Sequence, residues 1–138
     1  MEELKLHGGL CEEWGVDSSD SSLTPSPACQ AYCDFLTHQR QHAKTIAEIA
    51  AAMVPCMRLY AHLGQHFVAR GAPETAYAKW FDEYSSEDFE QLSQSLEAVL
   101  DEEISTGGGI TTMEQVQANY VRAMELERDF FAQHASKL

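Results

Sequence analysis

Cys56 and Tyr60 lie four residues apart in a long apolar stretch that is otherwise typical of helix, directly after Pro55. Side chains three and four residues apart share a helix face, so the thiol and the phenol are expected to point the same way. A thiolate here is a candidate nucleophile, although a cysteine on an apolar face is more often a small packing residue. Pro55 removes one helical hydrogen bond, which either opens a local cavity for a ligand or only redirects the helix.

Glu127 is a carboxylate at a position that the helical period assigns to the core. The apolar stripe of residues 111–135 runs through Tyr120, Ala123 and Phe130, and Glu127 falls in the same row. A buried carboxylate costs free energy unless it has hydrogen-bond partners or a raised pKa, and both conditions recur at catalytic sites. The alternative is a structural carboxylate that reaches water at the edge of the stripe or pairs with a buried tyrosine.

Two histidine pairs have the i, i+4 spacing that can hold a metal ion: His38 with His42, and His62 with His66. Neither pair has a carboxylate or a cysteine placed to complete a tetrahedral site, and the second pair lies opposite Tyr60 on its helix. Cys29 and Cys33, also four residues apart, are interpreted as packing residues. We therefore expect no metal.

The elements that must position these residues are predicted to be helices throughout, with no strand pattern and no repeat. A short amphipathic piece is expected over residues 2–14, and the Ser26–Pro27 step after a polar loop is typical of a helix start. Further helices are expected over residues 27–42, 43–70, 86–104 and 111–135, with a short one over residues 74–84. Apolar residues at helical spacing are expected to face inward, among them Ile46, Ile49, Met53, Phe67, Leu92 and Val99.

Length and charge limit the class of protein. The 138 residues suit one domain over residues 1–138, and 44 % hydrophobic residues indicate a folded chain. A formal net charge of -13 argues against nucleic acid or an anionic membrane surface as partner. No run of 18 apolar residues and no N-terminal signal is found, and the four cysteines show no disulfide spacing, so an intracellular setting is expected.

Four blocks in this order and spacing resemble the TenA / thiaminase II family: "PSPACQAYCDFL", "AAMVPCMRLYAHLG", "YAKWFDEYSSEDFE" and "AMELERDFFAQ". The resemblance runs from "HGGLCEEWGV" to the end of the chain and implies an all-α, haem-oxygenase-like helical bundle. Family chains begin with additional helices, one of which carries an aspartate and a tyrosine that hold the pyrimidine. We find no match to them, so the resemblance implies the C-terminal part of the domain and an incomplete pocket wall.

The resemblance places the nucleophile at Cys56 and the acid/base at Glu127. It also implies aromatic residues that shape the pocket and stack on a flat ring: Tyr32, Tyr60, Tyr84 and Phe130. The implied reaction is hydrolysis of an aminopyrimidine or of thiamin in thiamin salvage, by covalent addition of the cysteine to the ring and without a cofactor. Whether this chain is itself active stays open. The alternative is a catalytically incomplete helical protein that binds a pyrimidine or a partner subunit, and association into a homo-oligomer is expected because apolar surface would lie uncovered.

The chain ends in Ser136-Lys137-Leu138, which matches the peroxisomal import tripeptide. The signal works only when it is exposed, and helix termini commonly fray into solvent. In a eukaryotic source the tripeptide predicts peroxisomal import. The alternative is a chance match in a cytoplasmic protein, which is the usual setting of the family.

Overall fold

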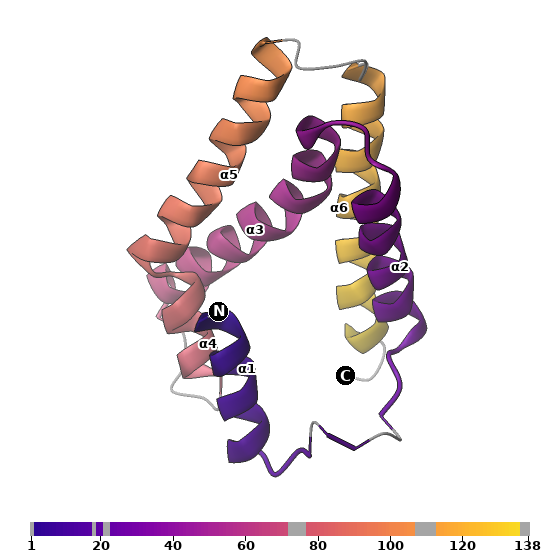
Figure 1. The fold of residues 1–138 in the computed structure, drawn as a ribbon. Helices are drawn as coiled ribbons and strands as arrows, with labels where there is room; N and C mark the ends of the chain where they lie inside the picture. The colour runs from indigo at the N-terminus through magenta and orange to yellow at the C-terminus, as the bar shows by residue number, and fades with distance from the viewer. Residues whose placement is uncertain (1, 18, 21–22, 72–76, 107–112, 136–138) are drawn as a thin grey trace.

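The computed structural model describes residues 2–17, 19–20, 23–71, 77–106 and 113–135. These residues form no strand and six helices, in the order α1 (Glu2–Glu13), α2 (Pro27–His42), α3 (Ile46–Ala69), α4 (Ala78–Tyr84), α5 (Glu87–Ser105) and α6 (Met113–Ala135) (Figure 1). The prediction of an all-helical protein is confirmed. The C-terminal tripeptide Ser136-Lys137-Leu138 lies outside the described residues, as do positions 74 and 111, where two helices were expected to begin.

Three helices begin after a hydroxyl residue whose side-chain oxygen accepts a hydrogen bond from the backbone three residues on: Ser26, Thr45 and Ser86. At the start of α3, Thr45 Oγ1 accepts from the N–H of Glu48 at 3.3 Å, and Glu48 Oε2 accepts from the N–H of Lys44 at 3.2 Å. Such caps contribute about 1 kcal/mol each and define where a helix starts. The expected start of this helix at residue 43 is therefore three residues early.

The central element is α3, which crosses the molecule with α5 along one side and α2 and α6 along the other (Figure 1). The core that joins α3 to α5 and α6 consists mainly of small side chains: Ala47, Ala50, Ala51, Val54, Leu100 and Val116. A second cluster joins Ala61 of α3 to Tyr84 and Phe89. Small residues let the helix backbones approach closely, so α3 packs through its alanine-rich face.

Asn119 ties three helices together inside the bundle. Its side-chain nitrogen donates to Gln39 Oε1 of α2 at 2.9 Å and to the backbone carbonyl of Glu48 in α3 at 3.1 Å. Buried polar groups are stable only when they are hydrogen-bonded, so this network specifies how α2 and α6 sit on the start of α3.

Arg58 joins α3 to α5 from the other side. Its guanidinium donates to the two oxygens of Glu97 at 2.8 and 2.6 Å and to Glu90 at 2.9 Å. The hydrogen bonds with Glu97 raise the pKa of Arg58, and those with Arg58 lower the pKa of Glu90. Bidentate hydrogen bonds between a guanidinium and a carboxylate of this kind fix the position of α3 relative to α5.

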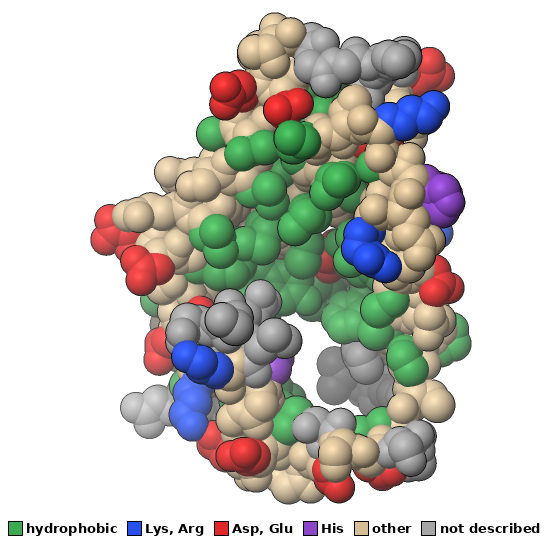
Figure 2. Space-filling model, viewed as in Figure 1, with side chains coloured by type: hydrophobic (Ala, Val, Ile, Leu, Met, Phe, Trp, Pro, Cys, Tyr) green, Lys and Arg blue, Asp and Glu red, His purple; other side chains and the backbone are tan. Residues whose placement is uncertain are grey.

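Several large apolar residues of α3 are exposed, and the prediction that these face inward is wrong, whereas Ala50 is buried as predicted and Met57, Tyr60 and Leu63 are half-buried. Ile46 is 56 % exposed and Met53 is 44 % exposed, and Leu92 of α5 is 56 % exposed. The same holds for Ile49, Phe67 and Val99. Hydrophobic side chains gather over the middle of the molecule, where α3 passes between α5 and α6 (Figure 2). The buried face of α3 is its small-residue face, because close helix packing excludes the larger side chains.

By length and composition alone, α3 could cross a membrane. The criterion of 18 consecutive apolar residues did not single it out, since Glu48 and Arg58 interrupt the run. In the structure α3 packs against α4, α5 and α6, as the core helix of a helical bundle does. A membrane partner remains unexpected, and this stays a prediction.

Candidate functional site

A cavity of about 520 Å³ lies between α1, α3, α4 and α6. Among the described residues, its lining includes eight aromatic side chains and no aspartate, glutamate, lysine or arginine. The space-filling view shows the molecule hollowed in this region, with hydrophobic side chains above the hollow (Figure 2). The volume is in the range of small-molecule sites, and the lining suits a flat, uncharged or cationic ring rather than an anion.

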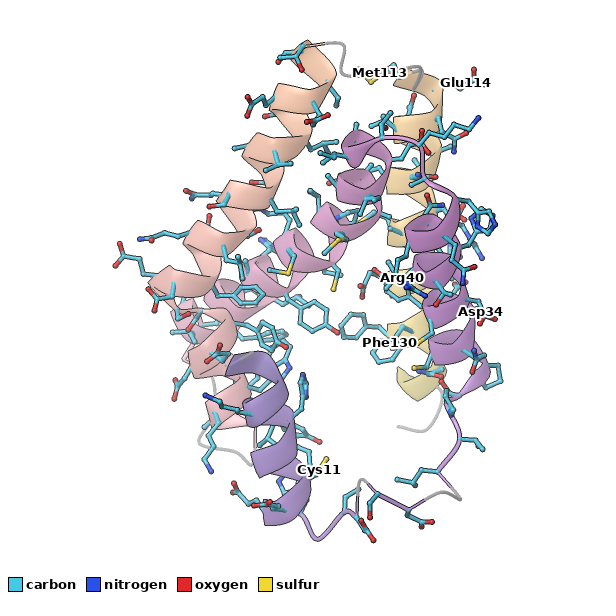
Figure 3. The ribbon with its side chains drawn as sticks, in the orientation of Figure 1. Cys11, Asp34, Arg40, Met113, Glu114 and Phe130 are labelled. Carbon is cyan, nitrogen blue, oxygen red and sulfur yellow. The ribbon has the colours of Figure 1, made fainter. Side chains whose placement is uncertain are left out.

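Four of the residues singled out from the sequence line this cavity: Cys56, Tyr60, Tyr84 and Phe130. The ring centroids of Tyr60 and Tyr84 are 5.0 Å apart in an edge-to-face arrangement. Figure 3 shows the ring of Phe130 directed from α6 into the interior of the molecule. Residues from three helices are therefore brought to one pocket.

The helix carries Cys56 to the pocket wall without ending at Pro55. The ring of Pro55 is buried, and Pro55 has no N–H to donate to the carbonyl of Ala51 one turn earlier. Cys56 forms no disulfide and is half-buried, with Tyr60 one turn further along the same wall. The thiol thus faces a cavity that a small molecule can enter.

Glu127 and Tyr32 are not among the lining residues, and Tyr32 lies near both Cys56 and Glu127. The pKa of Tyr32 is raised well above its ordinary value by burial first, then by the nearby Cys56 and Glu127. Glu127 is 2 % exposed. Among the described residues, neither the Tyr32 hydroxyl nor Glu127 Oε2 reaches the distance and angle of a formed hydrogen bond. The Tyr32 hydroxyl therefore keeps its proton at neutral pH and is available to a neighbouring carboxylate.

The candidate site contains three kinds of functional group. Cys56 carries a thiol, Glu127 carries a carboxyl group in a water-poor setting, and the aromatic walls offer surfaces for stacking. A thiol and an acid/base group beside a pocket that binds a flat ring can carry out covalent catalysis when that ring is electron-poor. Among the described residues no group of three metal-ligating side chains is gathered, and the absence of a metal stays a prediction.

Sequence reasoning missed the contribution of α1 to the pocket. His7, Leu10 and Trp14 line the cavity, and the Trp14 ring lies 5.4 Å from the ring of Tyr77, which also lines it. An ion pair between Glu13 and Lys79 at 2.5 Å adds a second tie between α1 and α4. The spacing of residues 7, 10 and 14 places them on one helix face. This shared face was the feature of the sequence that could have indicated their contribution to the pocket.

An all-helical bundle with a thiol at the wall of an aromatic pocket suits the binding of a small flat molecule. The chain belongs to the TENA/THI-4/PQQC family, which it matches over residues 1–137. This confirms the resemblance to TenA proteins.

Three relatives show how this family member compares with longer proteins. The chain is 38 % identical over 132 residues to the thiamine biosynthesis multifunctional protein ThiED of Corynebacterium efficiens, covering 95 % of this chain and 17 % of that protein. It is 30 % identical to the bifunctional TH2 protein, mitochondrial, of Arabidopsis thaliana, covering 100 % of this chain and 25 % of that protein. It is 24 % identical to the aminopyrimidine aminohydrolase of Halalkalibacterium halodurans, covering 94 % of this chain and 58 % of that enzyme. The chain thus spans about a fifth of the first two relatives and just over half of the third.

Proposed function

We propose that this protein hydrolyses an aminopyrimidine of thiamin salvage, exchanging the leaving group on an exocyclic methylene carbon for hydroxyl. The observation that carries the proposal is Cys56 at the wall of an aromatic pocket, with Tyr32 near both Cys56 and the buried Glu127. Membership of the family and the relatives named for thiamine biosynthesis and for aminopyrimidine hydrolysis support it.

The reaction follows from the chemistry of the thiol. The Cys56 thiolate adds to a carbon of the electron-poor ring, and a ring nitrogen takes up a proton supplied by Glu127. The electron pair of the new adduct expels the leaving group from the methylene carbon, as ammonia from a protonated amine or as a neutral heterocycle from a cationic one. Water then adds to that carbon and gives one proton to Glu127, the ring nitrogen loses its proton to solvent, and the thiolate leaves the ring. Substrate and water thus give hydroxymethylpyrimidine, the leaving group and one proton, with no oxidant or reductant.

The aromatic walls hold the ring during these steps. Tyr60, Tyr84 and Phe130 line the same pocket as the thiol, and offset or edge-to-face stacking on a flat ring contributes about 0.5–1.5 kcal/mol for each pair. Tyr32 keeps its proton and lies near Glu127, so it is placed to orient the carboxylate as a hydrogen-bond donor. These four residues act as positioning and binding residues.

The direct experiment is to incubate the purified protein with aminomethylpyrimidine, and separately with thiamin, and to detect hydroxymethylpyrimidine by chromatography. Release of this product supports the proposal. Tight binding of either compound in calorimetry without product would instead favour the second candidate, a helical protein that binds a pyrimidine without turnover. The exposed apolar row on α3 favours that alternative, because it leaves part of the bundle uncovered.

Glu127→Gln is expected to lower turnover by about a hundredfold or more while the melting temperature stays the same or rises. An amide is cheaper to bury than a carboxylate whose Oε2 lacks a hydrogen bond, but it does not shuttle a proton. Glu125→Gln is the matched control, since Glu125 pairs with Arg122 at the surface of the same helix. Full turnover together with a lower melting temperature in Glu127→Gln would show that Glu127 is structural.

We further propose that two copies of the chain associate through the exposed apolar row of α3, formed by Ile46, Ile49, Met53 and Phe67. Exposed apolar side chains gathered on one helix of an acidic chain are typical of an interaction site. Light scattering during size-exclusion chromatography gives the mass directly. A monomer at every concentration would contradict the proposal.

A separate proposal concerns where in the cell the protein is found, and it rests on the C-terminal Ser136-Lys137-Leu138. We propose that in a eukaryotic cell it is read as an import signal by peroxisomes, since the tripeptide matches that signal. A fluorescent protein extended by the last residues of this chain is expected to collect in peroxisomes. A diffuse signal that does not change when Leu138 is deleted would indicate a chance match.

A further inference from the structure

Cys29 and Cys33 form a pair of thiols on α2 that the proposed reaction does not use. The two positions are one turn apart, about 40° from each other around the helix axis, so their Cβ atoms are about 5–6 Å apart. Neither residue lines the cavity and neither forms a disulfide. Cys33 is exposed, which does not fit the packing role expected from the sequence, and Cys29 is half-buried. The pair can therefore be reached from solvent.

The two thiols interact with each other. The pKa of the Cys29 thiol is raised by burial first, and then by the charge and the hydrogen bonding of the Cys33 thiol. The second cause requires the two sulfur atoms to be close neighbours, in agreement with the spacing of the two residues on the helix. Both thiols are thus directed to the same place on α2, where they can bind one ligand together.

The surroundings of the pair favour a soft cation. Thiolates are the ligands that Cu(I) prefers, and two metal–sulfur bonds of about 2.3 Å span sulfur atoms up to roughly 4.6 Å apart. The Ser26 hydroxyl, which caps α2, accepts a hydrogen bond from the N–H of Cys29 at 3.2 Å. Cys29 therefore lies in the first turn, where the partial positive charge of the helix end stabilises a thiolate. A net charge of -13 on the chain attracts cations in general.

The number of ligands distinguishes between cations. Within the described part of the chain, no three metal-ligating side chains are gathered. Structural Zn(II) takes four ligands, so the thiol pair alone does not satisfy it. Two thiolates are sufficient for Cu(I), and the expectation of no metal concerned tetrahedral sites rather than a site of this kind.

We propose that Cys29 and Cys33 form a chelating site for a soft monovalent cation, Cu(I). Binding forms two sulfur–copper bonds and releases both thiol protons to solvent, so that Cu(I) and two thiols give a copper dithiolate with one negative charge and two protons. No electron is transferred. The site lies outside the pocket and is independent of the proposed hydrolysis, in which neither cysteine takes part.

The test measures Cu(I) binding by the full chain carrying Cys11→Ser and Cys56→Ser, which keeps the pair as its two remaining thiols. Anaerobic competition with a chromophoric Cu(I) chelator gives the affinity and the number of ions bound. One Cu(I) per chain is expected. Adding Cys29→Ser or Cys33→Ser is expected to weaken binding at least about a hundredfold, because the effective concentration of the second thiol is lost. Half an ion per chain would overturn the proposal, since copper would then join two chains.

Cys33→Ser combined with Asp34→Cys is the matched control. It keeps two thiols on α2, but position 34 lies about 140° around the helix from Cys29. Asp34 is exposed and accepts a hydrogen bond from Gln30 at the surface, so the fold should be kept, and circular dichroism checks this. The control is expected to bind Cu(I) as weakly as the single-thiol variants. Affinity within a few-fold of the intact pair in these variants would overturn the site, as would Zn(II) binding as tight as that of Cu(I).

Discussion

Cys56→Ser is expected to reduce the turnover of aminomethylpyrimidine at least about a thousandfold, because the step that activates the ring needs a thiolate. The serine hydroxyl has nearly the same size but is far less acidic, so it adds to the ring poorly. Cys56 is half-buried at a pocket wall, and the substitution removes no buried hydrocarbon. The helical content and the melting temperature should therefore remain close to those of the parent protein.

Cys33→Ser is the control for this prediction, since Cys33 is an exposed free cysteine on α2 that does not line the pocket. Circular dichroism reports the fold, and product release measured over a wide range of enzyme concentrations reports turnover. Turnover within a few-fold of the parent in Cys56→Ser would remove the covalent mechanism. It would leave acid/base catalysis by Glu127 on a bound ring as the remaining route.

Local signals in the sequence predicted the helix boundaries that depend on local chemistry. The Ser26–Pro27 step gave the start of α2, and the helix observed over Pro27–His42 agrees with the expected range. Capping depends on a side chain and a backbone N–H three residues away, so it can be found in the sequence alone. At Thr45 the same signal is present and places the start of α3 at Ile46, three residues after the predicted start at residue 43.

The buried face of α3 was not predictable from hydrophobicity. The pattern selects large residues such as Ile46 and Met53, whereas the packed face consists of alanines with Val54. How closely two helices approach depends on partners that are distant in the sequence, and a pattern within one helix does not contain this information. The contribution of α1 to the pocket was missed for the same reason, since Trp14 and Tyr77 are 63 positions apart.

The candidate site was predictable in part because two of its unusual features can be recognised from residues that are close together in the sequence. A proline beside a cysteine within a helix and a carboxylate in an apolar row are both visible in the sequence, at Pro55 with Cys56 and at Glu127. Their relation in space is tertiary: Glu127 lies near Tyr32 rather than on the pocket lining. A buried group that costs stability and has no packing benefit is typical of a residue that is retained for chemistry.

Gly64→Ala is expected to disrupt the packing of α4 on α3 and to destabilise the fold by about 3 kcal/mol or more. A Cβ atom at Gly64 would lie 2.6 Å from the backbone nitrogen of Ser85 and from the carbonyl oxygen of Tyr84. Both atoms belong to the backbone, so rotation of a side chain does not relieve the overlap. The end of α4 must move, and Tyr84 moves with it out of the pocket.

Gly9→Ala is the matched control, because Gly9 also lies within a helix but a Cβ there meets no atom within 4 Å. Alanine in a helix interior is more favourable than glycine by about 0.5–1 kcal/mol, so this variant should be neutral or slightly stabilised. Urea unfolding followed by circular dichroism gives both free energies of unfolding, and the fluorescence of Trp80 near Tyr84 reports the local packing. Equal stability of the two variants would mean that α3 and α4 do not approach each other at Gly64 as closely as described, and the position of Tyr84 in the pocket would lose its support.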